Sequence, residues 1–192
     1  MVARISVGKN LYGALAYNQN KVDEGGAKIL SAHLLRYPED GRFRPDESVR
    51  QFLEWMPNHY RTEKPVIHIS LNPHPDDVLT DGQLAEIGRE YMQRLGYGNQ
   101  PYLVFKHEDI GRHHIHIVSL RVDSEGRKVS DKFEYRRSKE ITELLEQKYG
   151  LHPAEGRKKG EEWQLKPVDV AKGDIKRQIA CTLKPLLELY SF

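Results

Sequence analysis

The chain has 192 residues, of which 38% are apolar and 30% are charged, enough apolar side chains for a folded domain with a strongly charged surface. The 30 Lys and Arg nearly balance the 28 Asp and Glu, which excludes a generic polycation, so any nucleic-acid binding must be local. One cysteine, Cys181, excludes an intrachain disulfide. Without a signal-peptide core or an apolar run of membrane-spanning length, we expect a soluble, cytoplasmic protein.

The first half of the chain alternates short strands with amphipathic helices. Residues 4–7 form a candidate strand, followed by a helix over 10–20 that Asn10 can cap. Residues 28–31 are a second candidate strand, and residues 45–55 have the pattern of a helix with acidic residues near its start. A β-branched run at 65–71 is a strand ended by Asn72 and Pro73.

The second half predicts a helix from Thr80 or Asp81 to Leu95, strands over 102–107 and 113–122, and helices over 137–149 and about 169–189. The short turn between the two strands makes them antiparallel. We therefore expect an α+β fold, a central antiparallel sheet flanked by helices. Residues 1–192 are expected to form a single domain. Because the chain stops without a cap or polar tail, we expect it to be the N-terminal part of a longer protein.

The segment 107–118 carries four of the nine histidines. His114 and His116 are two residues apart in a strand, so their side chains share a face. Gly111 favours a turn that returns the strand to His107, with Asp109 beside it. Three imidazoles with open positions left over are typical of a catalytic metal site. Chance clustering is the alternative.

A nucleophile for such a site is not given by a local motif. The sequence has neither a Gly-x-Ser-x-Gly turn nor a Gly-rich phosphate loop with a lysine. The remaining candidates are Tyr12 and Tyr17 on the first helix. Five residues apart, they lie on different faces of a helix, so one metal site can use only one of them.

These residues carry a resemblance to a known family. The spacing His107-x-Asp109-x4-His114-x-His116, together with the preceding segment 11–18, resembles the relaxase/mobilisation nuclease domain of mobilisable plasmids and integrative elements, a tyrosine HUH endonuclease. The similarity covers roughly residues 1–150 in the same order. The three-histidine motif is its more specific part.

The resemblance implies a DNA relaxase that nicks and rejoins one strand at an origin of transfer through a 5′-phosphotyrosyl intermediate. It makes His107, His114 and His116 the metal ligands, with Mg²⁺ or Mn²⁺ expected in function and Zn²⁺, Ni²⁺ or another ion able to occupy the site. Asp109 would orient a ligand or accept the tyrosine proton. Tyr17 matches the nucleophile better than Tyr12. The implied partners are single-stranded or hairpin origin DNA and relaxosome accessory proteins.

DNA contacts are expected from a hydroxyl residue and from basic side chains. Thr80, or alternatively Ser70, occupies the place of the family's hydroxyl residue, although Thr80 also has a sufficient role as a helix cap. The expected basic contacts are Arg112, Arg136 and Arg137. Phosphate contacts are also open to Lys128, Lys132 and residues 157–159, and base stacking to Phe133 and Tyr135.

Two other functions stay open. A rolling-circle replication initiator shares the metal motif but usually carries its tyrosine after the histidines, where Tyr135 and Tyr149 lie in this chain. A non-catalytic origin-binding protein would keep the metal for structure alone. The absence of a fourth strong ligand argues against a purely structural zinc site.

Overall fold

The computed structural model describes residues 1–39, 42–108 and 113–154, and Met1–Ala154 forms one compact unit. Five strands and four helices follow one another along it, alternating except for the successive strands β4 and β5. They are β1 (Val2–Gly8), α1 (Leu11–Asp23), β2 (Ala27–His33), α2 (Pro45–Trp55), β3 (Val66–Asn72), α3 (Asp81–Leu95), β4 (Tyr102–His107), β5 (His114–Leu120) and α4 (Glu134–Tyr149). The helix expected over 169–189 lies outside the described residues, so the single-domain expectation stays a prediction.

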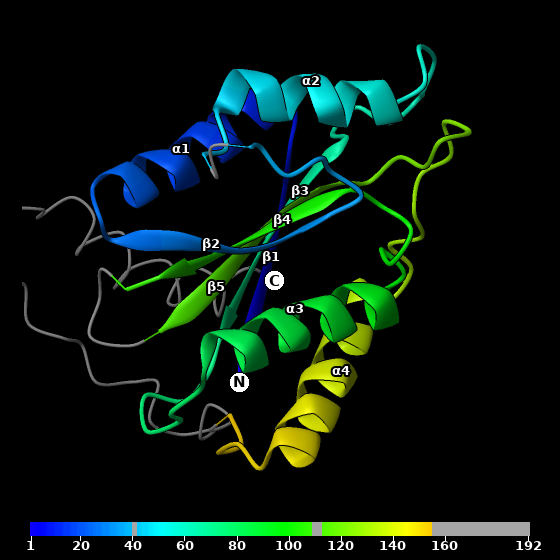
Figure 1. The fold of residues 1–192 in the computed structure, drawn as a ribbon. Helices are drawn as coiled ribbons and strands as arrows, with labels where there is room; N and C mark the ends of the chain where they lie inside the picture. Colours follow the sequence, from blue (N-terminus) through cyan, green and yellow to red (C-terminus); the bar gives the residue numbers. More distant parts are fainter. Residues whose placement is uncertain (40–41, 109–112, 155–192) are drawn as a thin grey trace, which may run out of the picture. The chain divides into compact units, whose positions relative to one another are not determined.

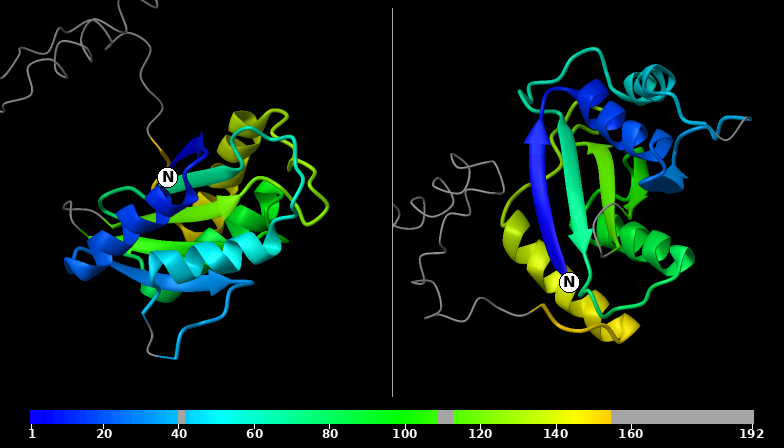
Figure 2. Two further views of the ribbon diagram at one scale, coloured as in Figure 1. Left: turned by 90° about the horizontal axis from the view of Figure 1, so that it is seen from above. Right: turned by 90° about the vertical axis from the view of Figure 1, so that its left-hand side faces the viewer.

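The five strands form one sheet in the order β1-β3-β5-β4-β2, and every neighbouring pair is antiparallel. Helices α1 and α2 lie on one face and α3 and α4 on the other (Figures 1 and 2). The expected α+β architecture is confirmed. Of the strands that are neighbours in the sheet, only β4 and β5 follow each other directly in the chain. Most of the strand order therefore comes from pairing between segments that are distant in sequence.

The alternation of side chains along the central strands divides the core in two. Ile67, Ile69, Ile115 and Ile117 are fully buried on the face covered by α3 and α4. The alternate positions of the same strands, Val66, Val118 and Leu120, pack with Phe105 of β4 against α1 and α2 on the other face. Each helix pair therefore covers its own apolar layer.

Local signals set the ends of the helices. Asn10 caps α1 by accepting a hydrogen bond from the Gly13 amide at 2.8 Å. Thr80 caps α3 in a capping box with Gln83, and Gly96 ends α3 with φ of 101°, a left-handed conformation that suits glycine. Helix α4 begins at Glu134, three residues before the expected start at Arg137.

No helix of the described residues is both long and apolar enough to cross a membrane.

Candidate metal centre and active site

Three histidines meet at one end of the sheet, where β4 ends and β5 begins. One ligand nitrogen from each of His107, His114 and His116 lies within 4.8 Å of the others, and this is the one such group among the described residues. His107 and His114 are directly opposite each other in the β4–β5 register. Ile115 and Ile117 point into the α3/α4 core, so His114 and His116 lie on the face that carries α1.

Two of the three side chains are buried, and His116 is partly exposed. His107 is 1% exposed and His114 is 7% exposed. Three convergent neutral imidazoles are suitable ligands for a divalent metal and leave further positions open for substrate or water. Nitrogen donors favour ions such as Zn²⁺ and Ni²⁺, whereas Mg²⁺ prefers oxygen ligands. The donor set fits a bound divalent ion, and its identity stays open.

Asn18 of α1 fixes the orientation of His107. Its side-chain amide donates to the Ala14 carbonyl at 2.7 Å, so its Oδ1 atom is the one directed at His107 Nε2, at 2.9 Å. Because Oδ1 can only accept, His107 carries its hydrogen on Nε2, and the lone pair of the neutral ring is then on Nδ1. Asn18 is completely buried, which makes this contact part of the core.

His68 of β3 is a member of the site that the sequence did not reveal. Its Nε2 atom lies 2.8 Å from Nδ1 of His116, and burial lowers the pKa of His68 below its usual value, which favours the neutral ring. A neutral His68 can accept a hydrogen from Nδ1 of His116, leaving Nε2 of His116 for the metal. Ligand histidines are commonly oriented by such a second hydrogen bond.

Tyr17 lies beside the histidines, and it comes from the same helix as Asn18. Its ring centroid is 6.1 Å from that of His107, with planes at 29°, and 6.4 Å from that of His116. Half of the side chain remains exposed, so the ring is accessible to a substrate. Tyr12 is equally exposed, but among the described residues no ring contact joins it to the histidines. The geometry therefore supports Tyr17 over Tyr12.

The hydroxyl residues expected to contact DNA lie on opposite faces. Thr80 is at the start of α3, across the sheet from the three histidines, and it acts as the helix cap. Ser70 is directly opposite His116 in the β3–β5 register, and its hydroxyl lies 3.2 Å from the Asn72 amide that donates to it. Of the two, Ser70 has the position of a residue that can reach a strand bound at the histidines.

Two of the expected basic contacts are far from the histidines. Strand β5 carries the chain about 20 Å away before α4 begins, so proximity in sequence to β5 does not place Arg136 and Arg137 at the site. Arg136 pairs with Glu140 at 3.0 Å, and Arg137 donates to the carbonyls of Leu95 and Ser130. Arg137 thus provides a hydrogen-bond donor for the carbonyl of Leu95, the last residue of α3. Their roles in DNA binding stay predictions.

The remaining residues expected at this centre either lie outside the described residues or belong to α4. Asp109 and Arg112 lie outside the described residues, as do residues 157–159. Tyr135 is 76% exposed at the start of α4, and the Tyr149 hydroxyl donates to Glu90 at 3.2 Å. Neither Tyr135 nor Tyr149 therefore lies in the position that Tyr17 occupies.

The fold and the site together define an antiparallel α+β domain. Three histidines that could bind a metal ion lie with a tyrosine at one end of its sheet. Residues 17–151 match the family described as "Relaxase: MobA/VirD2-like, nuclease domain", and the chain belongs to this family. The matched span begins at Tyr17 and includes the three histidines but not Tyr12. A comparison with curated proteins gives no match. Membership implies a metal-dependent, relaxase-type DNA nicking function at an origin of transfer.

Proposed function

We propose that the domain nicks and rejoins one DNA strand at an origin of transfer, using Tyr17 as the nucleophile, during conjugative mobilisation. The observation that carries the proposal is the position of the Tyr17 ring next to His107 and His116. The proposed nucleophile on α1 thereby lies beside the proposed metal ligands on β4 and β5. The family provides the substrate class, which is origin DNA.

The proposed reaction is a transesterification. The Tyr17 hydroxyl oxygen attacks the phosphorus, a Tyr–O–P bond forms, and the bond from phosphorus to the 3′-oxygen breaks. The products are a 5′-phosphotyrosyl strand and a 3′-oxygen that is released as a hydroxyl by taking up a proton. The reverse attack by a 3′-hydroxyl rejoins a strand, because the covalent bond to tyrosine preserves the phosphoester.

His107, His114 and His116 would hold the ion, which when bound polarises a phosphoryl oxygen and offsets charge that develops on it. Asn18 and His68 orient two of these rings through hydrogen bonds. The phenol proton must leave as the bond to phosphorus forms, because a free tyrosine has a pKa near 10. Asp109, close in sequence to His107, is the proposed acceptor.

The donor set also guides the choice of ion. Three imidazoles would bind Mn²⁺, Zn²⁺ or Ni²⁺ more tightly than Mg²⁺, whose preferred ligands are oxygens. We expect nicking with Mn²⁺ at lower concentrations than with Mg²⁺. Accessory proteins of the relaxosome are proposed as partners on the basis of the family alone.

A covalent adduct tests the nucleophile directly. The full chain is incubated with Mn²⁺ and labelled single strands that tile the DNA around its own origin, and the products are separated on a denaturing gel. Tyr17→Phe should abolish the labelled protein band, whereas Tyr12→Phe should retain it. The two tyrosines are matched controls, since both are on α1 and both are 50% exposed. An adduct that persists in Tyr17→Phe overturns the assignment.

The same gel separates the two other functions. Loss of the adduct in Tyr135→Phe or Tyr149→Phe, but not in Tyr17→Phe, would indicate an initiator that uses a downstream tyrosine. Specific binding to an origin strand without any adduct, in protein that holds a metal, would indicate a non-catalytic DNA-binding protein.

A further inference from the structure

An open cleft lies at the end of the sheet opposite the histidines. It has a volume of about 1190 Å³ and lies between residues 58–64, which precede β3, and residues 121–128, which follow β5. Figure 1 shows these two loops together at one end of the sheet, whereas β4 ends and β5 begins at the other end. A volume above the usual range for small-molecule pockets suits an extended polymer.

The lining of the cleft is strongly basic. Five Lys or Arg side chains line it against two glutamates, although the whole chain has a formal net charge of only +2. This concentration of charge is the local basic surface that a nearly neutral DNA-binding protein needs. The lining cations are Arg61, Lys64, Arg121, Arg127 and Lys128.

These cations differ in how far protein carboxylates already neutralise them. Arg121 pairs with Asp131 at 2.9 Å, and Arg127 pairs with Asp123 at the same distance. Within the part of the chain that the structure describes, Arg61 and Lys64 are exposed and have no ion pair. Arg121 is only 7% exposed and its charge is already paired with Asp131, so the charge that remains for a ligand comes from Arg61 and Lys64. The cleft therefore retains charge for an anionic ligand.

An aromatic side chain stands among the cations. Tyr60 lines the cleft and is 39% exposed, and His59 precedes it in the same wall. Basic side chains that follow a backbone, with exposed rings on which bases stack, are the usual combination for binding unpaired nucleic acid. A duplex would offer the phosphates but would keep its bases stacked on one another.

The walls of the cleft are already in place. Gly126 adopts φ of 81°, and a Cβ added there would lie 2.5 Å from the His59 carbonyl oxygen. The turn after β5 therefore packs directly on the segment before β3. Arg121 and Lys128 are held on the same wall by Asp131. A ligand would meet a preformed site and would not have to order these loops.

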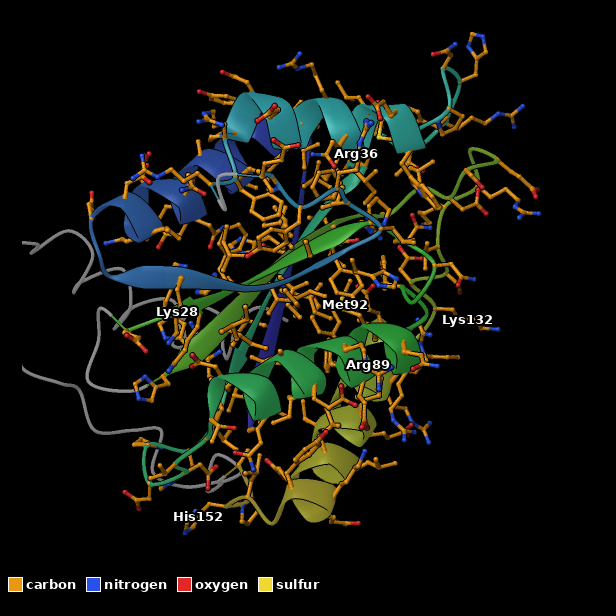
Figure 3. The ribbon with its side chains drawn as sticks, viewed as in Figure 1. Lys28, Arg36, Arg89, Met92, Lys132 and His152 are labelled. Atoms are coloured by element: carbon orange, nitrogen blue, oxygen red, sulfur yellow. The ribbon has the colours of Figure 1, made fainter. Side chains whose placement is uncertain are left out.

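The same sheet face offers a path between the histidines and the cleft end. Exposed Arg4 and Ser6 of β1 lie opposite Ser70 and His68 of β3. β1 ends at Gly8, opposite Val66, and Lys64 is two residues before Val66. A strand that leaves the histidines along β1 and β3 reaches the end that carries Lys64 after about 20 Å. Figure 3 shows Lys28 and Lys132 at these two opposite ends.

We infer that this cleft binds single-stranded DNA through its phosphates and bases, and thereby holds the substrate strand at a distance of about 20 Å from the bond that is cut. Arg61 and Lys64 contact phosphates, and Tyr60 stacks on an unpaired base. The inference rests on the proposed function for the identity of the ligand as DNA. It adds a second point of attachment, which the metal centre does not supply.

The salt dependence of binding tests the phosphate contacts without knowledge of the origin sequence. The probe is a long oligothymidylate, whose affinity for the full chain is measured by fluorescence anisotropy over a range of salt concentrations. Arg61→Ala with Lys64→Ala should reduce the slope of log affinity against log salt by about 1.4, since each single-strand phosphate contact contributes about 0.7. Arg50→Ala with Lys139→Ala removes two exposed cations outside the cleft and should leave the slope unchanged.

The aromatic contact has its own test. Tyr60→Ala should weaken oligothymidylate binding about five-fold or more, and Tyr60→Phe should restore it, because stacking requires the ring and not the hydroxyl. A duplex probe should respond to the charge variants but not to Tyr60→Ala. Equal slopes for the two double variants, or equal effects of Tyr60→Ala on duplex and single strand, would overturn the inference.

The outcomes also separate this inference from the proposed function. A wild-type protein that forms no adduct but shows the expected slopes would contradict relaxase chemistry and leave the cleft intact as a DNA site. Normal adduct formation, together with equal salt slopes for the two double variants, would contradict DNA binding by the cleft but not the proposed relaxase function.

Discussion

Nε2 of His68 lies 2.8 Å from Nδ1 of His116, and this contact joins β3 to the metal-type histidines of β4 and β5. The two residues are diagonal neighbours, because Ser70 and not His68 is opposite His116 in the register. The contact directs Nε2 of His116 away from β3. We therefore propose that His68 orients His116 as a metal ligand without itself binding the metal.

Replacing His68 should weaken metal binding more than it weakens the fold. We expect His68→Ala to reduce the affinity for Mn²⁺ about 10- to 100-fold, the usual effect of removing a partner of a ligand histidine. Isothermal titration calorimetry on the full chain measures the affinity. His68→Gln keeps a hydrogen-bond acceptor and should recover part of the loss.

Unfolding of the metal-free variants provides the control for His68. If His68 were only a packing residue, His68→Ala and His68→Gln would lower the metal-free melting temperature and the metal affinity in parallel. An affinity that is equal in wild type and His68→Ala would contradict the positioning role.

Asn18→Leu should disrupt the connection between α1 and the histidines. The substitution keeps the side-chain volume but removes the acceptor of His107 Nε2, leaving a buried polar atom without its partner. We expect a loss of about 1–3 kcal/mol in the free energy of unfolding and a weaker Mn²⁺ affinity, measured by urea denaturation and calorimetry. Gln19→Leu, one residue along α1, removes an amide that donates to Asp23 at 3.0 Å and should leave the metal affinity unchanged.

Much of the site followed from local sequence patterns. The period of two placed His114 and His116 on one face, and the short β4–β5 connection returned them to His107. Helix α2 and strand β4 have the bounds expected from the sequence, because apolar periodicity and flanking Pro or Gly residues are local signals. Tyr17 was favoured by resemblance, and the structure places it beside the histidines.

The parts that could not be predicted depend on pairing between distant segments. A single histidine in the strand 65–71 has no local feature that relates it to His116. Only the insertion of β3 between β1 and β5 brings the two rings together. The same topology explains Arg136 and Arg137, which follow β5 closely in sequence but lie at its far end. Sequence separation is a poor measure of distance once a strand has crossed the sheet.

Thr80 should act as a helix cap and not as a DNA contact. Its hydroxyl accepts from the Gln83 amide at 3.2 Å, and Gln83 accepts from the Thr80 amide at 2.9 Å. Thr80→Ala should cost about 1 kcal/mol in the free energy of unfolding, and Thr80→Ser should cost little. Adduct formation per folded molecule should be unchanged in both. A defect in adduct formation by Thr80→Ala at full folding would return Thr80 to the DNA-binding surface.

Asp77 should stabilise the position of the segment after α4, which contains His152, in a pH-dependent way. Its side chain is 3% exposed and lies 2.6 Å from the His152 ring, and it also accepts from the backbone amides of His74 and His152. Burial by itself would raise the pKa of Asp77, but the hydrogen bonds from His152 and His74 outweigh it and lower the pKa below the ordinary value of 3.8. Other titratable groups near it are the His74 ring, Asp76 and the amino group of Met1.

The sign of the effect follows from this lowered pKa. The charged carboxylate contributes fully at pH values above 3.8, and its contribution is lost as the pH falls through the lower pKa of the folded state. Asp77→Asn should therefore reduce the free energy of unfolding by about 1–3 kcal/mol at neutral pH. The difference from wild type should shrink steadily at pH values below 3.8 in urea denaturation curves. A difference that stays constant across this range would mean that the charge of Asp77 does not stabilise the contact.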